Sequence, residues 1–374
     1  MIAAVEQGAK PEAGKDWSFS GSYAPDDVVF LLNPKAITPI DLAEKERLIQ
    51  SGERHYSEML SPEAVPDERY MRLYADTLAA NAPRVRHDVA ALARAIRARP
   101  QTAESCVVVS LARAGTPIGI LLKRALQRLG VTAWHYSISI IRGRGIDAQA
   151  LAYIAARHGT ANAVFVDGWT GKGSIRGELD GALASGRSGF APFLAVIADP
   201  AGRADLAATC DDYAIPSGLL NGIVSGLVSR SVLNSALVGP GDFHACLYMP
   251  EHAASDVSRA YLAAIEDAAD WQPASPGWSP ALATAAREAS EKMIKTIAAE
   301  CGVRDINRIK PGIAEATRAV LRRVPDRIYV QRRSDPAVAH IGLLAESAGV
   351  PVIERDLQTY RAVTIIKDLG GMQQ

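Results

Sequence analysis

Three short loops combine glycine with hydroxyl or basic side chains, and each of them follows an apolar segment. The most informative loop spans 167–174 and comes directly after the apolar run 163–166. Glycines let backbone N–H groups converge on an anion, and the N-terminus of a following helix adds roughly half a positive charge. We therefore predict that this loop binds phosphate. The residues expected to contact it are Gly168, Trp169, Thr170, Gly171, Lys172, Gly173 and Ser174.

Asp167 stands where the apolar run ends and the loop begins. A carboxylate in this position can accept hydrogen bonds from sugar hydroxyls or hold Mg²⁺ through water. We expect Mg²⁺ as the cofactor, and its protein ligands stay unassigned.

The other two loops carry arginines. Arg113 in loop 110–117 offers a fork of donors to phosphate oxygens, and Gly115 permits a close backbone approach. Loop 142–147 holds Arg142 and Arg144 and could close over a polyphosphate, excluding water and stabilising charge. A solvated turn is the alternative for that loop. With Asp167, these three arginines are the candidate catalytic residues.

The segments around these loops alternate between apolar and amphipathic patterns, which predicts an α/β fold with a parallel sheet. Ligands of such sheets bind at the carboxyl ends of the strands, where all three loops lie. Strands are expected at 28–32, 107–111, 134–141, 163–166, 194–198 and 213–215. Helices are expected at 38–51, 67–98, 117–129, 148–157 and 175–184.

The length of 374 residues favours more than one domain. We predict a flexible tail over 1–16, a main domain over 17–270, a linker over 271–284 rich in Pro, Ser and Trp, and a small α/β domain over 285–374. The net charge is zero, so the whole molecule has no general attraction to nucleic acid or membrane. Without a signal segment or a long apolar run, we expect a cytoplasmic protein with no membrane partner.

The order of the three loops resembles the type I phosphoribosyltransferase family. In that family the phosphate loop follows two acidic residues, whereas here Val166 takes the first acidic position and Asp167 the second. The resemblance implies a pyrophosphate loop at 110–115, with Ser110, Ala112, Ala114 and Gly115 as contacts, and a catalytic flexible loop at 142–147. It also implies an acceptor hood near Asp212 or Asn221.

Segments 23–28 and 55–59, taken with the 167–173 loop, are similar to a bacterial family found with tellurite-resistance and stress-response genes. That family is labelled either phosphoribosyltransferase-like or the cysteine protease StiP. The resemblance implies a glycosyltransferase that binds phosphoribosyl diphosphate or a related nucleotide and transfers pentose to or from an unknown acceptor. Since one carboxylate is missing, a nucleotide sensor without catalysis is an alternative. A homodimer is one expected assembly of this chain.

A cysteine protease is the third hypothesis, and it needs a thiolate beside a histidine. The four cysteines lie far apart without a C-x-x-C pair, so neither a disulfide framework nor a zinc ribbon is expected. His244 and Cys246 are two residues apart and would share one face of a strand, which makes them the best pair. Cys106 is expected to be a buried packing residue.

The C-terminal region has its own charge pattern, because residues 304–333 contain nine Lys or Arg against three acidic residues. The pattern from Gly312 to Arg318, with the strand-like segments after it, resembles the Pelota-type RNA-binding fold. The resemblance implies RNA as a partner, with a solvated helix face as the alternative for the arginines. The implied RNA-contacting residues are Lys310, Gly312, Glu315 and Arg318.

Overall fold

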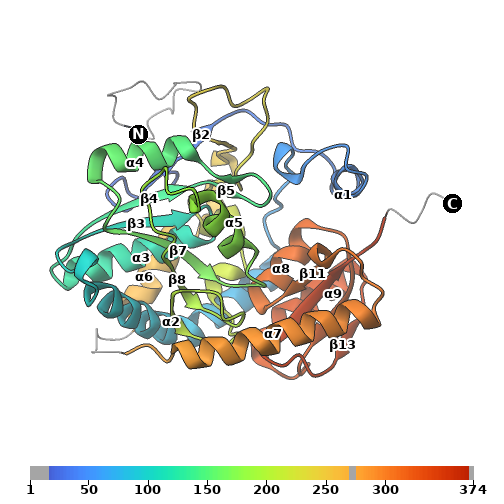
Figure 1. Cartoon of the computed structure of the whole chain (residues 1–374). Coiled ribbons are helices and arrows are strands. Elements are labelled where there is room, and N and C mark those ends of the chain that lie inside the picture. Colours follow the sequence, from blue (N-terminus) through green and yellow to red (C-terminus); the bar gives the residue numbers. More distant parts are fainter. Residues whose placement is uncertain (1–16, 269–274, 370–374) are drawn as a thin grey trace.

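The computed structural model describes residues 17–268 and 275–369 (Figure 1). The tail predicted over 1–16 and part of the linker predicted over 271–284 lie outside the described residues. No helix among the described residues has both the length and the apolar character needed to cross a membrane.

The centre of the molecule is a parallel sheet of six strands in the order β1-β4-β3-β7-β8-β9. The strands are β1 (Val29–Leu31), β3 (Ser105–Leu111), β4 (Thr132–Ile138), β7 (Ala163–Trp169), β8 (Leu194–Ala198) and β9 (Leu206–Thr209). From β3 the chain moves outward to β4 on one side, and it later returns to place β7 on the other side. The boundary between β3 and β7 is therefore the point where the strand order reverses.

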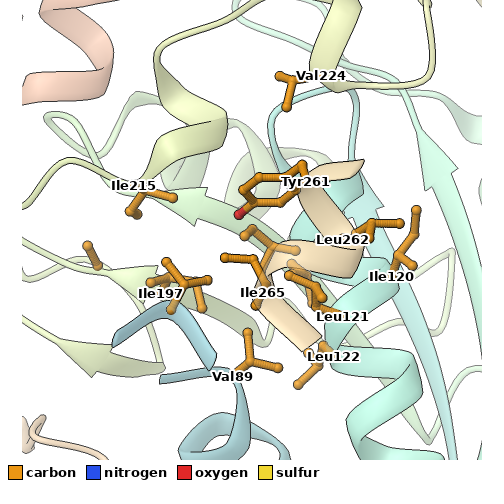
Figure 2. Packing of buried hydrophobic residues seen from close by; sticks show 14 of the residues in the cluster. Val89, Ile120, Leu121, Leu122, Ile197, Ile215, Val224, Tyr261, Leu262 and Ile265 are labelled. Atoms are coloured by element: carbon orange, nitrogen blue, oxygen red, sulfur yellow. The ribbon is translucent and has the colours of Figure 1, made fainter. Parts of the chain in front are cut away.

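Helices cover both faces of this sheet because successive strand residues point to opposite sides. Val108 and Val164 pack with α2 (Glu68–Arg97), α3 (Gly115–Arg128) and α6 (Ser258–Asp267). Val109 and Phe165 pack on the other face with α4 (Ala148–His158) and α5 (Ser174–Leu183). In Figure 2 the apolar face of α6, with Tyr261 at its centre, packs against α3 and the sheet.

The C-terminal segment forms a second sheet in the order β11-β14-β12-β13. Its strands are β11 (Ile309–Pro311), β12 (Pro325–Val330), β13 (Val352–Glu354) and β14 (Ala362–Ile366), and its helices are α7 (Pro280–Glu300), α8 (Ile313–Arg322) and α9 (Ala339–Ala348). Figure 1 shows this segment beside the main sheet, with α7 running along both. Ile313 and Ile328 belong to the same apolar cluster as the central strands, so the two parts share a continuous core.

The remaining elements are short and lie around the sheet edges. They are α1 (Leu42–Gln50), β2 (Asn33–Pro34), β5 (Ile140–Ile141), β6 (Gly145–Ile146) and β10 (Ala245–Cys246). Seven 3₁₀ turns complete the described chain: η1 (Tyr56–Glu58), η2 (Pro100–Thr102), η3 (Pro216–Gly218), η4 (Gly222–Val224), η5 (Pro250–Ser255), η6 (Ile306–Arg308) and η7 (Pro336–Val338).

The predicted fold class is confirmed: an α/β protein with a parallel-sheet core, an N-terminal helical extension and a small C-terminal α/β segment. One predicted strand is wrong, since residues 213–215 form no strand and the edge strand is β9. The side chains at 213–215 are buried in the main apolar cluster. Their apolar character therefore reflects packing and not strand pairing.

Candidate functional site

A cavity of about 300 Å³ opens at the carboxyl ends of β3 and β7, where the strand order reverses. Parallel α/β sheets bind ligands at such a point because the neighbouring loops diverge there. The main sheet contributes residues at the ends of β3 and β7, and the separate β5–β6 hairpin contributes Ile140, Ile141 and Arg142. Helix α1 contributes Lys45, and α8 closes the opposite side. Because most of its charged side chains are basic, we call this cavity the basic pocket.

The 167–174 loop forms one wall of the basic pocket, as its residues Asp167 and Trp169 through Ser174 all line the cavity. Asp167 accepts a 2.8 Å hydrogen bond from the backbone N–H of Gly168. Burial raises the pKa of Asp167 to about 7, although this hydrogen bond and nearby Arg318 act in the opposite direction. Gly173 adopts a left-handed conformation with φ of 87° immediately before α5, which a residue with a side chain would rarely adopt.

The loop after β3 is divided between the pocket and the protein interior. Ala112, Arg113 and Ala114 line the pocket. Ser110 instead lies in the core, where its hydroxyl is 2.8 Å from Nε2 of His135. A Cβ at Gly115 would meet the carbonyl oxygen of Val166 at 2.3 Å, so this glycine serves the close packing of α3 on β7.

Arg113 is buried and already has a carboxylate partner. Its guanidinium forms a 2.5 Å ion pair with Glu63 and donates to the carbonyl of Val228 at 2.7 Å. Burial alone would raise the pKa of Glu63, but Arg113 and Arg322 outweigh it and lower this pKa to about 2.

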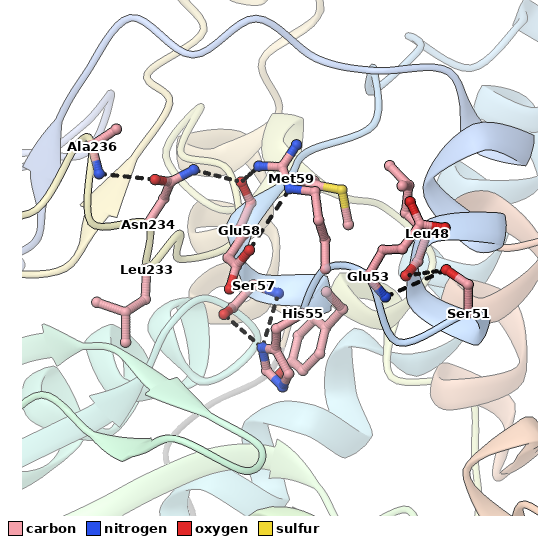
Figure 3. Close-up of polar contacts among 12 residues, drawn as sticks. Leu48, Ser51, Glu53, His55, Ser57, Glu58, Met59, Leu233, Asn234 and Ala236 are labelled. Carbon is pink, nitrogen blue, oxygen red and sulfur yellow. Dashed lines mark hydrogen bonds and ion pairs between the residues drawn. The ribbon is translucent and has the colours of Figure 1, made fainter.

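The 142–147 loop is a hairpin end between β5 and β6, and its two arginines diverge. Arg142 lines the pocket, and its backbone N–H donates to the hydroxyl of Tyr56 at 2.8 Å. Arg144 does not line the cavity and pairs with Glu58. Figure 3 shows that the Glu58 backbone is also hydrogen-bonded to Asn234, whose side-chain amide donates to the Glu58 carbonyl at 3.4 Å.

The residues expected to contact RNA face the main sheet. Lys310, Glu315 and Arg318 line the basic pocket, and Arg318 donates to the carbonyl of Ser217 at 3.3 Å. Gly312 lies outside the cavity lining, where a Cβ would come within 3.5 Å of the Asp212 carboxylate. The helix expected to enter RNA is therefore covered by the core in this arrangement.

Several pocket residues were missed by the sequence predictions. Lys45 and Arg230 come from segments without a recognisable motif, and Arg176 follows the 167–174 loop in the first turn of α5. Arg322 and Arg323 were counted in the basic C-terminal region, but their position on the pocket was not foreseen. The excess of basic residues there was the only signal that could have found them.

The charge of the basic pocket does not fit the expected Mg²⁺. Its two acidic side chains are Asp167 and Glu315, and they stand among ten lysines and arginines. Hard divalent cations need several oxygen ligands, which this lining does not supply. Among the described residues, no group of three or more His, Cys, Asp and Glu side chains could hold a metal ion.

The expected thiol–imidazole pair is not formed. Cys246 is fully buried, and Nδ1 of His244 lies 2.7 Å from the hydroxyl of Ser139. Burial raises the pKa of Cys246 above its ordinary range and that of Cys106 to about 12. Across residues 17–268 and 275–369, no hydrogen bond joins a cysteine thiol to a histidine ring, whereas Cys301 lies 3.2 Å from the hydroxyl of Tyr329.

Partly exposed thiols occur at Cys210 and Cys301 in the described chain. Burial, followed by the charge of Asp199, raises the pKa of Cys210 to about 11. Cys210 directly follows β9 and so stands at the same edge of the sheet as the loops described above.

Both parts of the chain match known protein families. Residues 21–266 match the family described as "Tellurite-like stress resistance cysteine protease StiP". Residues 288–368 match the "PELOTA RNA binding domain" family. A protein from Acinetobacter baylyi named "Cysteine protease StiP" is 41% identical over 366 residues, covering 94% of this chain and 95% of that protein.

Solved structures of hypoxanthine phosphoribosyltransferase from Trypanosoma cruzi are also similar. One of them, complexed with the product IMP, is 14% identical with a TM-score of 0.27, covering 47% of this chain and 91% of that chain. Another is 15% identical with a TM-score of 0.26, covering 36% and 77%. Likeness at this level carries no conclusion about activity.

The expectation of a phosphoribosyltransferase is therefore wrong. Glycosyl transfer, phosphoribosyl diphosphate and catalytic magnesium conflict with the protease name carried by the matching family and by the relative from Acinetobacter baylyi. No finding supports a nucleotide substrate or a homodimer. The misleading feature was the loop order, which belongs to the parallel-sheet architecture and does not specify the reaction.

The match over 21–266 and the 41% identity across nearly the whole length lead to one conclusion. The chain belongs to the tellurite-like stress resistance cysteine protease StiP family and carries a C-terminal Pelota RNA-binding domain.

Proposed function

We propose that this protein is a cysteine protease. One observation supports the proposal: the relative named Cysteine protease StiP is 41% identical over 94% of this chain. A protease of this class attacks a peptide carbonyl with a thiolate, so the chain must supply a thiol that substrate can reach.

Cys210 is the nucleophile that we propose. The family match over 21–266 contains three of the four cysteines, and of these three Cys106 and Cys246 are fully buried. Cys210 is the partly exposed thiol of that segment. No histidine ring bonds to Cys210 within the described chain, so its thiolate must form by direct ionisation. Its pKa of about 11 leaves little thiolate at neutral pH, and the activity should therefore be low there and increase with pH.

The test is hydrolysis of labelled casein by the full chain between pH 7 and pH 10. We expect the rate to rise about tenfold per pH unit, because the thiolate fraction does so below the thiol pKa. Cys210→Ala should reduce hydrolysis to background, and Cys301→Ala, outside the 21–266 match, should keep it. Unchanged hydrolysis in Cys210→Ala would reject this nucleophile, and no hydrolysis by the natural chain would reject the protease proposal.

We also propose that the C-terminal segment binds RNA, a function favoured by the Pelota match over 288–368. Arg318 and its neighbours face the core, so we assign the contact to exposed basic residues. Within the basic region 304–333 the exposed residues are Arg304, Arg332 and Arg333. Phosphate contacts of this kind give an affinity that falls steeply with salt.

The RNA proposal is tested by fluorescence anisotropy with a labelled hairpin RNA at several salt concentrations. The double change Arg332→Gln with Arg333→Gln should weaken binding about tenfold and lower the salt dependence. The matched control is Arg187→Gln, an exposed arginine of the main segment. Binding that is equally weakened in the control, or that is absent at low salt, would contradict the proposal.

A further inference from the structure

We propose that the basic pocket is a binding site for a compact polyanion of the polyphosphate class. Residues of the main domain and of the C-terminal domain would bind this anion jointly. The proposal does not depend on proteolysis, since it concerns a different set of side chains from Cys210.

Seven of the ten basic side chains that line the pocket form no ion pair with a carboxylate of the described chain. Arg113, Arg176 and Arg323 have such partners. The residues without an ion pair are Lys45, Arg142, Lys172 and Arg230 of the main domain and Lys310, Arg318 and Arg322 of the C-terminal domain. Charged groups that fold away from water are ordinarily paired, so this surplus of positive charge favours the binding of an anion.

The neutral partners of these residues leave donors unused. Arg322 donates to the side-chain oxygen of Asn221 at 2.8 Å, and Arg230 to the carbonyl of Tyr56 at 2.6 Å. Among the described residues, Nε of Arg318 and Nε of Arg113 are buried and have no hydrogen-bond partner, and Arg113 is only 3% exposed. The side chain of Lys310 has no hydrogen bond or ion pair within the described chain, although its backbone belongs to β11. An anion in the cavity would satisfy such donors.

The pKa values of the pocket lysines are consistent with an anion site. Burial, and then the repulsion of other cations, lowers the pKa of Lys45 and of Lys172 to about 7. Burial likewise lowers the pKa of Lys310 to about 8, against the attraction of Glu315. A bound anion would reverse these shifts, because it stabilises the charged forms.

The cations come from several segments and line one continuous cavity, which is why we infer more than one anionic centre in the ligand. Lys45 is repelled by Arg230, Arg322 and Arg323. Lys172 is repelled by Lys310 and Arg142. Lys310 is repelled by both Arg323 and Arg142 and so links these cations. A ligand with several linked phosphates could offset more of this repulsion than a single orthophosphate.

The aromatic side chains of the pocket argue against recognition of a nucleobase. Tyr56 has the guanidinium of Arg230 at 5.3 Å from its ring centroid and that of Arg142 at 5.5 Å. Trp169 has the guanidinium of Arg318 at 4.7 Å. Because arginine guanidinium groups already lie over these rings, a stacking base would have to displace the arginines. The pocket is therefore suited to the anionic part of a ligand.

The test measures inorganic tripolyphosphate binding to the full chain by calorimetry, in buffer free of divalent cations and at physiological ionic strength. We expect tripolyphosphate to bind at least about tenfold more tightly than orthophosphate. Lys310→Met removes one charge and no hydrogen bond, so it should weaken binding about tenfold. The matched control is Lys295→Met on the exposed side of α7, which should bind like the natural chain.

Thermal melting separates a binding role from a structural one. Without anion, Lys310→Met should melt no lower than the natural chain, because it relieves repulsion, and the rise in Tm caused by tripolyphosphate should shrink. The proposal is overturned if the natural chain does not bind tripolyphosphate, or if both lysine variants bind it equally well. It is also overturned if a single-stranded RNA, but not tripolyphosphate, binds in a way that requires Lys310.

Discussion

Asp212 is a buried carboxylate that joins the two parts of the chain. Its two oxygens accept hydrogen bonds from the backbone N–H of Ile313 at 3.0 and 3.1 Å, and one of them accepts from the N–H of Arg361 at 2.8 Å. Ile313 begins α8, so this side chain from the core satisfies a free N–H of a helix in the other domain. The sequence resemblance implies that Asp212 or Asn221 faces a ligand, whereas the Asp212 carboxylate bonds to backbone N–H groups of the C-terminal domain.

Replacing Asp212 with Ala should lower the free energy of unfolding by about 2–4 kcal/mol, because two buried N–H groups lose their acceptor. Asp212→Asn should cost less, since its amide oxygen still accepts. The measurement is urea denaturation, with Asp26→Ala on the exposed surface as the control. Equal stability of Asp212→Ala and Asp26→Ala would show that the interdomain hydrogen bonds contribute nothing.

The same denaturation series should depend on pH in a defined direction. Burial raises the pKa of Asp212 to about 7, against the hydrogen bonds from Arg361 and Ile313. A carboxyl whose pKa is higher in the folded state stabilises most below about pH 4, and this contribution is lost as the pH rises through 7. Asn cannot ionise, so Asp212→Asn should lack this part of the pH dependence.

At the level of elements, α7 is placed by a close backbone contact with the turn after β8. A Cβ at Gly202 would lie 1.9 Å from the carbonyl oxygen of Ala283, and Gly202 has a φ of 61°. The turn is fixed by Asp199, which accepts from the N–H of Arg203 at 2.7 Å. The guanidinium of Arg287 on α7 then donates to the Gly202 carbonyl at 2.9 Å. Glycine is required here for both space and conformation.

Gly202→Ala should therefore destabilise the protein by about 3 kcal/mol or more, through the strained φ and the clash with α7. Gly186→Ala is a matched control, because Gly186 has a φ of 65° and a Cβ added there would meet no atom within 4 Å. It should cost only about 1 kcal/mol. Thermal and urea denaturation of both variants measure the difference, and equal losses would mean that the contact with α7 is not needed.

At the level of the whole molecule, the two family-matched segments share one apolar core and one pocket. The main cluster runs from the central strands into α8 and β12. Arg323 of the C-terminal domain pairs with Glu46 of α1, and Arg361 pairs with Asp211 at 3.0 Å. A chain predicted as two units joined by a linker thus folds with a broad interface, and the Pelota helix α8 forms one side of the basic pocket.

The local pattern of the sequence was enough to predict most of this architecture. The apolar runs around Val108 and Phe165, with amphipathic segments between them, identify buried strands and covering helices without any knowledge of contacts. The same pattern places the loops beginning at Asp167 and Arg142 at one edge of the sheet. These features follow from residue spacing, which acts over a few neighbouring positions.

Other properties depended on contacts between distant segments and could be decided only by the tertiary structure. Loop order suggested the wrong reaction, because many activities share parallel-sheet loops. Lys45 and Arg230 carry no motif, and they reach the pocket only because the chain folds back on itself. The sequence by itself therefore determined the layers and the position of the loops. The tertiary structure decided which cations converge, which thiols are accessible and which arginines face the core, since burial and charge balance arise from packing between remote residues.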